Sequence, residues 1–494
     1  MKIVLITGTS NLNLQDANVF VKGLPPYLDL LSDGRKANLS PPIPQLGVVA
    51  LASFLSEHGF YVDVFDFSVN YEKMDKLKGY DLIGISSTSL NYDDMVKLCE
   101  LSKSSNSMVI AGGQRAAFHK TELVRKRMVD GVVVGEGELA MLKICMRLQK
   151  GEDISGVPGL YTTKSYAKDE HIENLDSLPL PKWDFLDLGS YIPTLPIQSM
   201  RGCPYSCAYC METRFWDKPV RLRQEKHVVK EIKNNVDSYG IKTFRFVDSC
   251  FTAFPERTKR ICDIIREEAL GIQWTCYARA DTLSAELVQS MSDAGCIGVD
   301  IGAESGSDVI LQKMFKNSSS RKIRDAIRIC KNAGMLVHTN FIIGFPGETK
   351  ETIADTVSLI KESRPTTYCF NPLFVYPGTK LYEDKEKYGL TGKFERWKHK
   401  TMSCREVERT IHSLFKHELA SLDDSHYFFG GEHAANVLCA LGYDKEEIKE
   451  IYRSFNELCF HNKKWVIKQL LLSKIGFRRF KSFFKGVRDL RAYA

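Results

Sequence analysis

The sequence has no hydrophobic run long enough to cross a membrane. Its longest apolar stretch, Leu46–Leu55, falls well short of the roughly 20 residues that span a bilayer. Residues Met1–Thr7 contain a single basic side chain and an apolar run too short for the hydrophobic core of a signal peptide, and they are typical of a buried first strand. These absences predict a cytoplasmic protein without an export signal.

Closely spaced cysteines are also scarce. Only one group of the 14 cysteines is tightly spaced, and internal repeats and low-complexity tracts are absent. In a cytosolic chain, cysteines are thiols, metal ligands or redox groups more often than disulfides. With 494 residues, 44% hydrophobic and 26% charged, the composition is that of a globular protein of about two to four domains. The eleven scattered cysteines are expected to be small buried hydrophobic residues.

The net charge of +7 belongs to the carboxyl-terminal tail. Lys463–Ala494 contains ten Lys or Arg residues against Asp489 alone, so the tail carries +9 and the other residues sum to −2. No nucleic-acid partner is expected, because the rest of the chain has no excess of positive charge. Residues 464–490 predict a basic amphipathic helix that rests on a membrane surface, binds an acidic partner, or packs on the protein's own core.

The first 150 residues alternate strand-like apolar runs with amphipathic stretches. This alternation predicts a doubly wound, Rossmann-like parallel α/β domain over residues 1–150. Residues 151–197 are rich in proline and lack a long helical period, which indicates a linker with one short hairpin. The runs and stretches are 2–7, 46–57, 61–67, 82–86, 95–101, 108–112, 131–134 and 138–148.

A second alternating block predicts an open, partial (β/α)6 barrel of the TIM type over residues 198–390. Strand signals vanish from about residue 391, so 391–494 is expected to be a helical region, with helices at 403–420, 432–439, 444–459 and 464–490. The barrel strands are expected at 196–200, 243–247, 272–276, 298–303, 337–343 and 368–375, and its helices near 225–239, 256–269, 284–294, 319–333 and 349–362.

Three cysteines stand on one short loop directly after the first barrel strand. Cys203, Cys207 and Cys210 have the spacing C-x3-C-x2-C. Three thiolates can hold three corners of a cubane [4Fe-4S] cluster, whereas a fully protein-ligated cubane needs a fourth cysteine. The remaining iron keeps an open coordination position, as in catalytic metal sites generally. The loop therefore predicts a catalytic cluster.

Two other interpretations of this loop compete with the cluster. Cys207 and Cys210 alone could form a redox dithiol, and Cys250 could complete a four-cysteine zinc site. The dithiol leaves Cys203 without a role, and zinc needs a paired second cysteine group that the sequence lacks. Both interpretations explain less of the loop than the cluster does.

With this loop, the chain resembles the radical S-adenosylmethionine (radical SAM) superfamily over residues 198–380. The resemblance implies that S-adenosylmethionine (SAM) chelates the open iron and is cleaved to a 5′-deoxyadenosyl radical, with a reductase, flavodoxin or ferredoxin as electron donor. Met211 and Glu212 hold the place of the segment that receives the SAM amino group. Around Asp248 the chain resembles the family stretch F-x-D-D-x-F-T, which implies a cofactor contact for Asp248, although Ser249 replaces the second aspartate.

Motifs at other predicted strand ends match the same superfamily. The sequence I-G-A-E-S-G-S resembles the strand end whose glutamate lies near the cofactor, which implies SAM contacts for Glu304 and Ser305. The sequence F-I-I-G-F-P-G-E-T resembles the fifth-strand element beside the adenine, which implies a contact at Gly344. Arg279, after the third strand, is a candidate contact for a carboxylate or phosphate, or else a surface ion pair.

The first domain resembles the cobalamin-binding domain of corrinoid-dependent radical SAM enzymes. The motifs that carry this are P-Q-L-G-V-V-A-L, S-S-T-S, I-A-G-G-Q-R and V-V-G-E-G-E, small-residue stretches that fall mostly at strand ends, where an open α/β sheet binds its ligand. The resemblance implies cobalamin contacts for Thr88, Gly112, Gly113, Gly135 and Glu136. Plain tight turns are the alternative interpretation of these small residues.

Two other ligands suit the first domain less well. The sequence G-E-G-E-L-A matches a dinucleotide fingerprint, yet Glu136 and Glu138 would put negative charge where a pyrophosphate needs backbone N–H groups. Methylthiotransferases of the superfamily carry a second cluster on three further cysteines, and here only Cys99 and Cys145 precede Cys203. Neither a nicotinamide site nor a second cluster is expected.

Many cobalamin domains supply a cobalt-ligating histidine from a D-x-H-x-x-G loop after the first strand. Thr7–Val19 contains no histidine, and His58 and His119 are more typical of helix ends and loops than of ligands. The resemblance therefore implies cobalamin bound without a protein histidine on cobalt.

These features predict a cobalamin-dependent radical SAM methyltransferase. It is expected to act on an unactivated carbon, or on phosphorus, of a small biosynthetic intermediate, through a 5′-deoxyadenosyl radical and methylcobalamin. The first alternative is an enzyme with the same cofactors that catalyses cyclisation or another oxidative rearrangement without methyl transfer. The second is a non-enzymatic corrinoid and iron–sulfur sensor, against which the barrel motifs argue.

Overall fold

The computed structural model describes residues 1–7, 43–67, 69, 76–87, 92–103, 107–216, 219–414, 419, 422, 424–427, 431–440 and 442–460. They fall into two compact units, one ending at Tyr191 and the other beginning at Ile192. The predicted tail helix at 464–490 and the predicted contact Thr88 lie outside the described residues. No helix among the described residues is long and apolar enough to cross a membrane.

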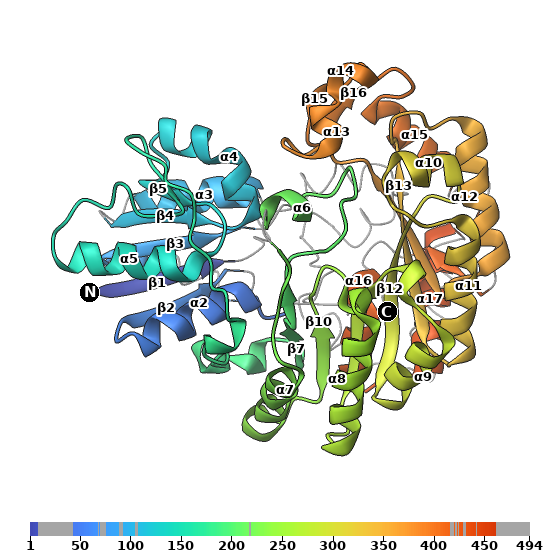
Figure 1. Ribbon diagram of the computed structural model, residues 1–494, viewed down its shortest axis with the longest axis horizontal. Coiled ribbons are helices and arrows are strands. Elements are labelled where there is room, and N and C mark those ends of the chain that lie inside the picture. The colour runs from blue at the N-terminus through green and yellow to red at the C-terminus, as the bar shows by residue number, and fades with distance from the viewer. Residues whose placement is uncertain are drawn as a thin grey trace, which may run out of the picture. The chain divides into compact units, whose positions relative to one another are not determined.

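The first unit is built on a six-stranded sheet in the order β2-β1-β3-β4-β5-β6 (Figure 1). The first five strands run parallel, and β6 is antiparallel to β5. Parallel strands are covered on both faces, which explains their almost unbroken apolar sequences. The strands are β1 (Lys2–Thr7), β2 (Tyr61–Asp66), β3 (Leu82–Ser86), β4 (Met108–Gly112), β5 (Gly131–Val133) and β6 (Leu160–Tyr161).

Helices cover both faces of this sheet, as the predicted doubly wound arrangement requires. One apolar core contains Val48 and Ile144, and a separate core contains Leu98 and Val124. In sheets of this strand order, ligands bind at the carboxyl ends of β1 and β3, where the order reverses. The helices are α2 (Leu46–Glu57) and α5 (Gly137–Gln149), which pack together, and α3 (Tyr92–Lys103) and α4 (Gln114–Arg125), which also pack together.

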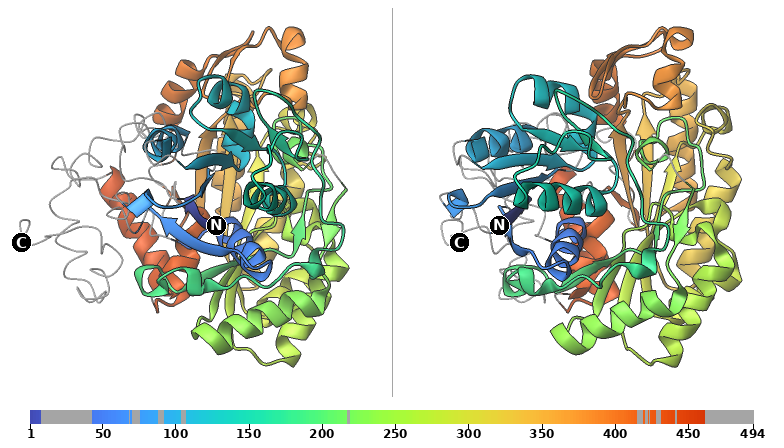
Figure 2. Two further views of the ribbon diagram at one scale, coloured as in Figure 1. Left: turned by 90° about the vertical axis from the view of Figure 1, so that its left-hand side faces the viewer. Right: turned by 60° about the vertical axis from the view of Figure 1, so that its left-hand side comes forward.

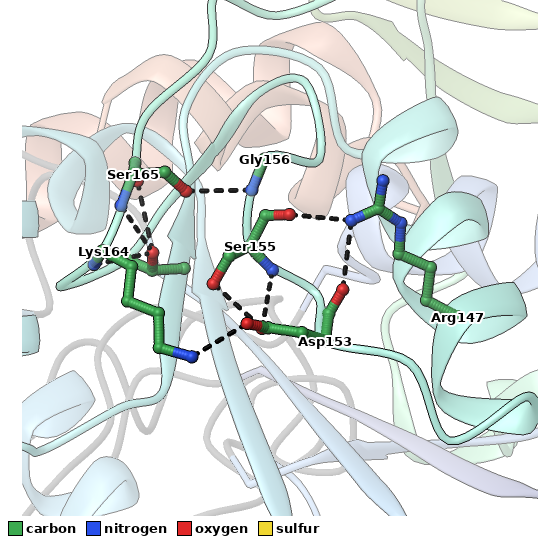
Figure 3. Close-up of polar contacts among 7 residues, drawn as sticks. Arg147, Asp153, Ser155, Gly156, Lys164 and Ser165 are labelled. Atoms are coloured by element: carbon green, nitrogen blue, oxygen red, sulfur yellow. Dashed lines mark hydrogen bonds and ion pairs between the residues drawn. The ribbon is translucent and has the colours of Figure 1, made fainter.

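The residues after α5 fold back onto this unit instead of leaving it as the predicted linker. Arg147, in the last turn of α5, donates through Nη1 to the carbonyl oxygens of Asp153 and Ser155 at 3.1 and 2.7 Å (Figure 3). The Asp153 carboxylate accepts from Lys164 Nζ at 2.8 Å and from the Ser155 hydroxyl at 2.9 Å. This turn leads into β6, which pairs with the otherwise open edge of β5.

The second unit contains a sheet of seven parallel strands in the order β17-β14-β13-β12-β11-β10-β7, which confirms the partial barrel. Its first strand begins a few residues before the predicted domain start. The strands are β7 (Thr194–Ile197), β10 (Thr243–Phe246), β11 (Gln273–Ala278), β12 (Cys296–Glu304), β13 (Leu336–Ile343), β14 (Thr367–Pro372) and β17 (His426–Tyr427).

Helices connect these strands and lie side by side along one side of the sheet (Figures 1 and 2). Trp274 faces this helix layer, because its Nε1 donates to the Ala294 carbonyl at 2.8 Å after α9. Side chains alternate along a strand, so Arg245 and Asp300, which pair at 3.5 Å, lie on the other face. The helices are α7 (Glu225–Tyr239), α8 (Pro255–Glu267), α9 (Ala285–Asp293), α11 (Ser320–Asn332) and α12 (Lys350–Ser363).

The carboxyl-terminal region is helical but also contains strands that the sequence did not predict. β15 (Thr391–Lys393) and β16 (Arg396–Lys398) form a hairpin, and β17 extends the barrel sheet beside β14. Strands of two or three residues have no periodic signal, and tertiary pairing decides them. The helices are α15 (Cys404–Leu414), α16 (Gly431–Ala440), which packs against β7 and β10 to β14, and α17 (Lys445–Phe460).

Candidate cluster and corrinoid sites

Asp248 anchors the backbone that leads into the cysteine loop. Its Oδ1 accepts from the backbone N–H groups of Ser199 and Met200 at 2.8 and 2.9 Å, and its Oδ2 accepts from the Ser199 hydroxyl at 2.7 Å. Arg257 bonds to the same serine from the other side. Asp248 is 1% exposed, and burial raises its pKa. Both of its carboxylate oxygens are therefore engaged by the protein, so Asp248 positions the loop.

The three predicted thiols lie together on the loop after β8 (Met200–Arg201). Cys207 is buried, whereas Cys203 and Cys210 are partly exposed. Burial raises the pKa of Cys203 and raises that of Cys210 to about 12, and the nearby Cys207 sulfur raises both further. Within the described residues, no three His, Cys, Asp or Glu side chains are arranged to hold a single metal ion. In a cubane cluster each of the three thiolates would bind a separate iron.

Arg279 lies buried beside this loop, 4% exposed, so the alternative of a surface ion pair is wrong. Its Nε and Nη2 donate to the two carboxylate oxygens of Asp281, both at 2.9 Å. Its Nη1 donates to Cys207 Sγ at 3.6 Å, and Nη2 also donates to the Lys316 carbonyl. The guanidinium carbon lies 3.8 Å from the centre of the Tyr205 ring. Arg279 thus links the third strand end to the cysteine loop.

Glu304 ends β12 in a buried ion pair. Its Oε1 accepts from Lys316 Nζ at 2.8 Å, and its carboxylate is hydrogen-bonded to Tyr209, between the second and third cysteines. Its φ of 65° is left-handed, a conformation that costs roughly 1–3 kcal/mol for a residue with a side chain. A Cβ on Gly302 would lie 2.6 Å from Glu304 Oε1, so a larger residue there would displace this ion pair. Through its hydrogen bond to Tyr209, Glu304 therefore helps to hold the cysteine loop in place.

Ser305, its neighbour, is fully buried in the turn that follows β12. Its hydroxyl accepts from the Ser307 N–H at 3.1 Å, and Gly306 N–H donates to Thr356 Oγ1 at 2.9 Å. A Cβ on Gly306 would lie 2.4 Å from the Asp355 carbonyl oxygen, so this glycine allows the turn to touch α12. The polar groups of Ser305 shape the turn.

Glu212 begins the short helix α6 (Glu212–Phe215) directly after Met211. Its Oε2 accepts from the Ser249 hydroxyl and from Trp216 Nε1, both at 2.7 Å. Ser249 is the residue that departs from the family pattern, and here its hydroxyl stabilises the carboxylate where a second aspartate would repel it. The serine at position 249 therefore fixes the orientation of the Glu212 side chain.

Gly344 is held by residues that follow it in the chain. Its N–H donates to Glu348 Oε2, and its carbonyl accepts from His399 Nε2 at 2.8 Å. The ring proton is on Nε2, because His399 Nδ1 accepts from the Thr401 and Met402 N–H groups. A Cβ on Gly344, whose φ is 101°, would lie 2.7 Å from the Trp397 ring. The hairpin segment therefore determines the backbone at Gly344.

At the carboxyl edge of the first unit, Gly112 ends β4 and Gly113 caps α4. Gly113 has a φ of 87°, and a Cβ there would lie 2.4 Å from the Ser87 carbonyl oxygen. The backbones that follow β3 and β4 therefore approach each other more closely than any side chain permits. These residues lie at the carboxyl ends of β3 and of its neighbour β4, and the β3 end is where ligands are expected in a sheet of this strand order.

Gly135 and Glu136, two strands from the order reversal, have protein partners. A Cβ on Gly135 would lie 2.4 Å from Asp169 Oδ2, and Glu136 Oε2 accepts from the Ile172 N–H at 3.2 Å. The segment after β6 thus covers this turn. His58 lies at the C-terminus of α2, where its Nδ1 is hydrogen-bonded to the Phe54 carbonyl at 2.8 Å, and His119 pairs with Glu122.

Comparison with known proteins bears on both units. The radical SAM superfamily model matches residues 197–360, and the B12 binding domain model matches residues 34–144. An uncharacterised methyltransferase of Pyrococcus horikoshii is 31% identical over 359 residues, covering 69% of this chain and 78% of that protein. The chain belongs to the radical SAM superfamily and carries a B12-binding domain.

Other relatives of this B12-binding radical SAM enzyme differ in the reaction their names state. The anaerobic magnesium-protoporphyrin IX monomethyl ester cyclase of Rubrivivax gelatinosus is 27% identical over 385 residues, covering 70% of this chain and 69% of that protein. The structure of the radical SAM methyltransferase TsrM from Kitasatospora setae, with cobalamin and a [4Fe-4S] cluster bound, has a TM-score of 0.65 at 16% identity and 99% coverage of both chains. At that identity the likeness shows a shared fold.

Sequence reasoning missed several residues that hold this site. A signal existed for Tyr209, which lies inside the cysteine motif, and for Asp281, two residues after Arg279. None existed for Lys316 or His399, because only the fold brings them to Glu304 and Gly344.

Proposed function

We propose that this B12-binding radical SAM enzyme is a methyltransferase for an unactivated carbon, or phosphorus, of a small molecule. One observation carries the proposal: the same chain contains two sites of different kinds. One is a loop with three thiols at the carboxyl edge of the barrel, and the other is a doubly wound sheet with glycines at the carboxyl ends of its strands. When bound, the cluster with SAM supplies a carbon-centred radical, and cobalamin carries the methyl group.

The residues of the barrel edge fit a cluster with one open position. Cys203, Cys207 and Cys210 would hold three irons, and the thiol-rich donor set is the one iron–sulfur clusters require. Asp248 fixes the start of their loop. Met211 and Glu212 would receive the SAM amino group through their backbone carbonyls, and the bond from Ser249 to the Glu212 carboxylate holds this segment in place.

The carboxyl edge of the first unit fits a broad ligand bound mainly by backbone. Gly112 and Gly113 put no side chain of their own on that edge, and Gly113 lets the backbone after β4 lie against that of Ser87, so this part of the edge is main chain. Gly135 and Glu136 support the neighbouring turn through Asp169 and Ile172. We propose that cobalamin binds there without a histidine from this chain on cobalt.

A cyclase or other oxidative rearrangement with the same cofactors is the second candidate. The relative in Rubrivivax gelatinosus favours it, since the similarity extends over 70% of this chain. The methyltransferase of Pyrococcus horikoshii favours methyl transfer, with a higher identity over a similar share.

Product analysis separates the two reactions. The enzyme is loaded anaerobically with iron, sulfide and cobalamin, reduced with dithionite, and supplied with SAM and candidate substrates. Methyl transfer yields both S-adenosylhomocysteine and 5′-deoxyadenosine, and the substrate gains one carbon by mass spectrometry. A cyclase yields 5′-deoxyadenosine with an unchanged carbon count. Failure to form 5′-deoxyadenosine under any of these conditions would leave only the sensor hypothesis.

We also propose a cytoplasmic location and a small electron donor, a flavodoxin, a ferredoxin or their reductase. Low-potential iron–sulfur chemistry needs a reducing compartment and an external source of electrons. A contact of the basic tail with a membrane or an acidic partner stays a sequence prediction, because residues 464–490 are outside the described part of the chain.

A further inference from the structure

Arg279 brings a permanent positive charge within hydrogen-bond distance of one predicted cluster ligand. Its Nη1 lies 3.6 Å from Cys207 Sγ, and both side chains are buried. A guanidinium remains protonated at any pH at which the protein is folded. The charge at this sulfur is therefore constant.

The position of the guanidinium is determined by groups other than the sulfur. Asp281 occupies the edge formed by Nε and Nη2, the Lys316 carbonyl takes a further Nη2 proton, and the Tyr205 ring stacks against the plane. The Nε–Nη2 edge of the guanidinium binds Asp281, and the Nη1–Nη2 edge points to Cys207 and the Lys316 carbonyl. Neither edge is therefore open for the carboxylate of a ligand.

We propose that Arg279 sets the reduction potential of the cluster through Cys207 and does not bind the SAM carboxylate. The inference rests on the proposed function. A hydrogen bond and a positive charge at a ligand sulfur stabilise the more negative, reduced cluster and so raise its potential. Asp281, on another edge of the guanidinium, opposes this effect with its negative charge while it holds Arg279 in place.

Two single substitutions should shift the potential in opposite directions. Arg279→Gln removes the cation and leaves the carboxylate, so the midpoint potential, measured by EPR-monitored titration of the loaded protein, becomes more negative. Asp281→Asn removes the opposing charge, so the potential becomes more positive. The double variant Arg245→Gln with Asp300→Asn removes a different buried ion pair of the same barrel, between β10 and β12, and should leave the potential unchanged.

A binding isotherm for SAM on the same loaded proteins decides between tuning and substrate binding. Retained SAM affinity with opposite shifts in potential supports the inference. Unchanged potentials, or a large loss of SAM affinity at unchanged potential, overturn it. If Arg279→Gln does not retain the cluster, the midpoint potentials of Asp281→Asn and Arg279→Lys test the inference instead. Arg279→Lys should shift the potential to more negative values by less than Arg279→Gln, because lysine keeps the charge but lacks the planar guanidinium. Failure of the unsubstituted protein to load a cluster would instead refute the proposed function.

Discussion

At the carboxyl edge of the barrel, the charged residues of the predicted site are buried and bonded to neighbouring groups of the protein, whereas at the carboxyl edge of the first sheet the central residues are glycines. Asp248, Arg279 and Glu304 each have protein partners that fix their polar atoms. Gly113 acts through the absence of a side chain, because it lets two backbones meet.

The difference follows from the ligands that the two edges are proposed to hold. A cluster is bound at three points, so its thiolates need a loop whose position is fixed by hydrogen bonds and ion pairs. A corrinoid is broad and is bound over a surface, so it needs the main chain to be accessible. The same strand-end location thus serves two different physical tasks.

The largest effect on cofactor loading is expected from the loss of a cysteine that would ligate the cluster. Cys207→Ala should abolish cluster assembly, measured by iron and sulfide content and by absorbance, while corrinoid titration is unchanged. Cys262→Ala, at a buried thiol of α8 away from the loop, is the matched control and should load normally. Loss of corrinoid binding in Cys207→Ala would show that the two edges do not work separately.

The support of the barrel loop should be nearly as sensitive. Asp248→Ala removes three hydrogen bonds to Ser199 and Met200 and takes from Arg257 the more strongly interacting of two carboxylates that stabilise its charge, the other being Glu225. Removal of one partner from such a buried charged network typically costs about 3–5 kcal/mol. Urea unfolding should show this loss, together with a lower cluster content. Normal stability and content would mean that the loop does not depend on Asp248.

The glycine edge can be tested with two alanine substitutions. Gly113→Ala should cost roughly 2–4 kcal/mol, because it combines backbone strain with a clash against Ser87, and should weaken corrinoid binding. Gly59→Ala has a similar φ, 83°, with nothing within 4 Å of the added Cβ, and should cost roughly 1–2 kcal/mol with normal binding. Equal effects on corrinoid binding would contradict the close-approach argument.

A smaller, pH-dependent effect is expected from Glu348, which holds Gly344. Burial raises the pKa of Glu348 to about 7, so the folded state binds a proton that the unfolded state has released between about pH 4.5 and 7. This contribution to stability therefore falls as pH rises through that window, by about 2 kcal/mol between pH 5 and 7. Glu348→Gln should flatten the dependence measured by denaturant unfolding. An unchanged slope would show that another group titrates.

Most of the fold could be predicted because its signals are local. The α7 residues carry their apolar positions at helical spacing, and Gly240 ends the helix in the left-handed conformation that glycine favours. The short hairpin expected within residues 151–197 is present at Tyr161 and Tyr166. The pairing of the edge strands β6 and β17 could not be predicted, because two residues have no period and their pairing partners decide them. Composition alone did not show that the segment after α5 packs on the first unit up to Tyr191, because contacts such as those of Arg147 with Asp153 and Ser155 form only in the fold.

By itself, the sequence determined which residues can carry the chemistry: C-x3-C-x2-C on one loop, and glycines at the ends of strands, because spacing within a loop and the absence of a Cβ are properties of the chain alone. Only the tertiary structure decided what surrounds them. Lys316 meets Glu304, His399 meets Gly344 and Arg279 meets Cys207, because parallel strands bring their carboxyl ends to one edge however far apart they lie in sequence. The electrostatics of the site is therefore a property of the fold.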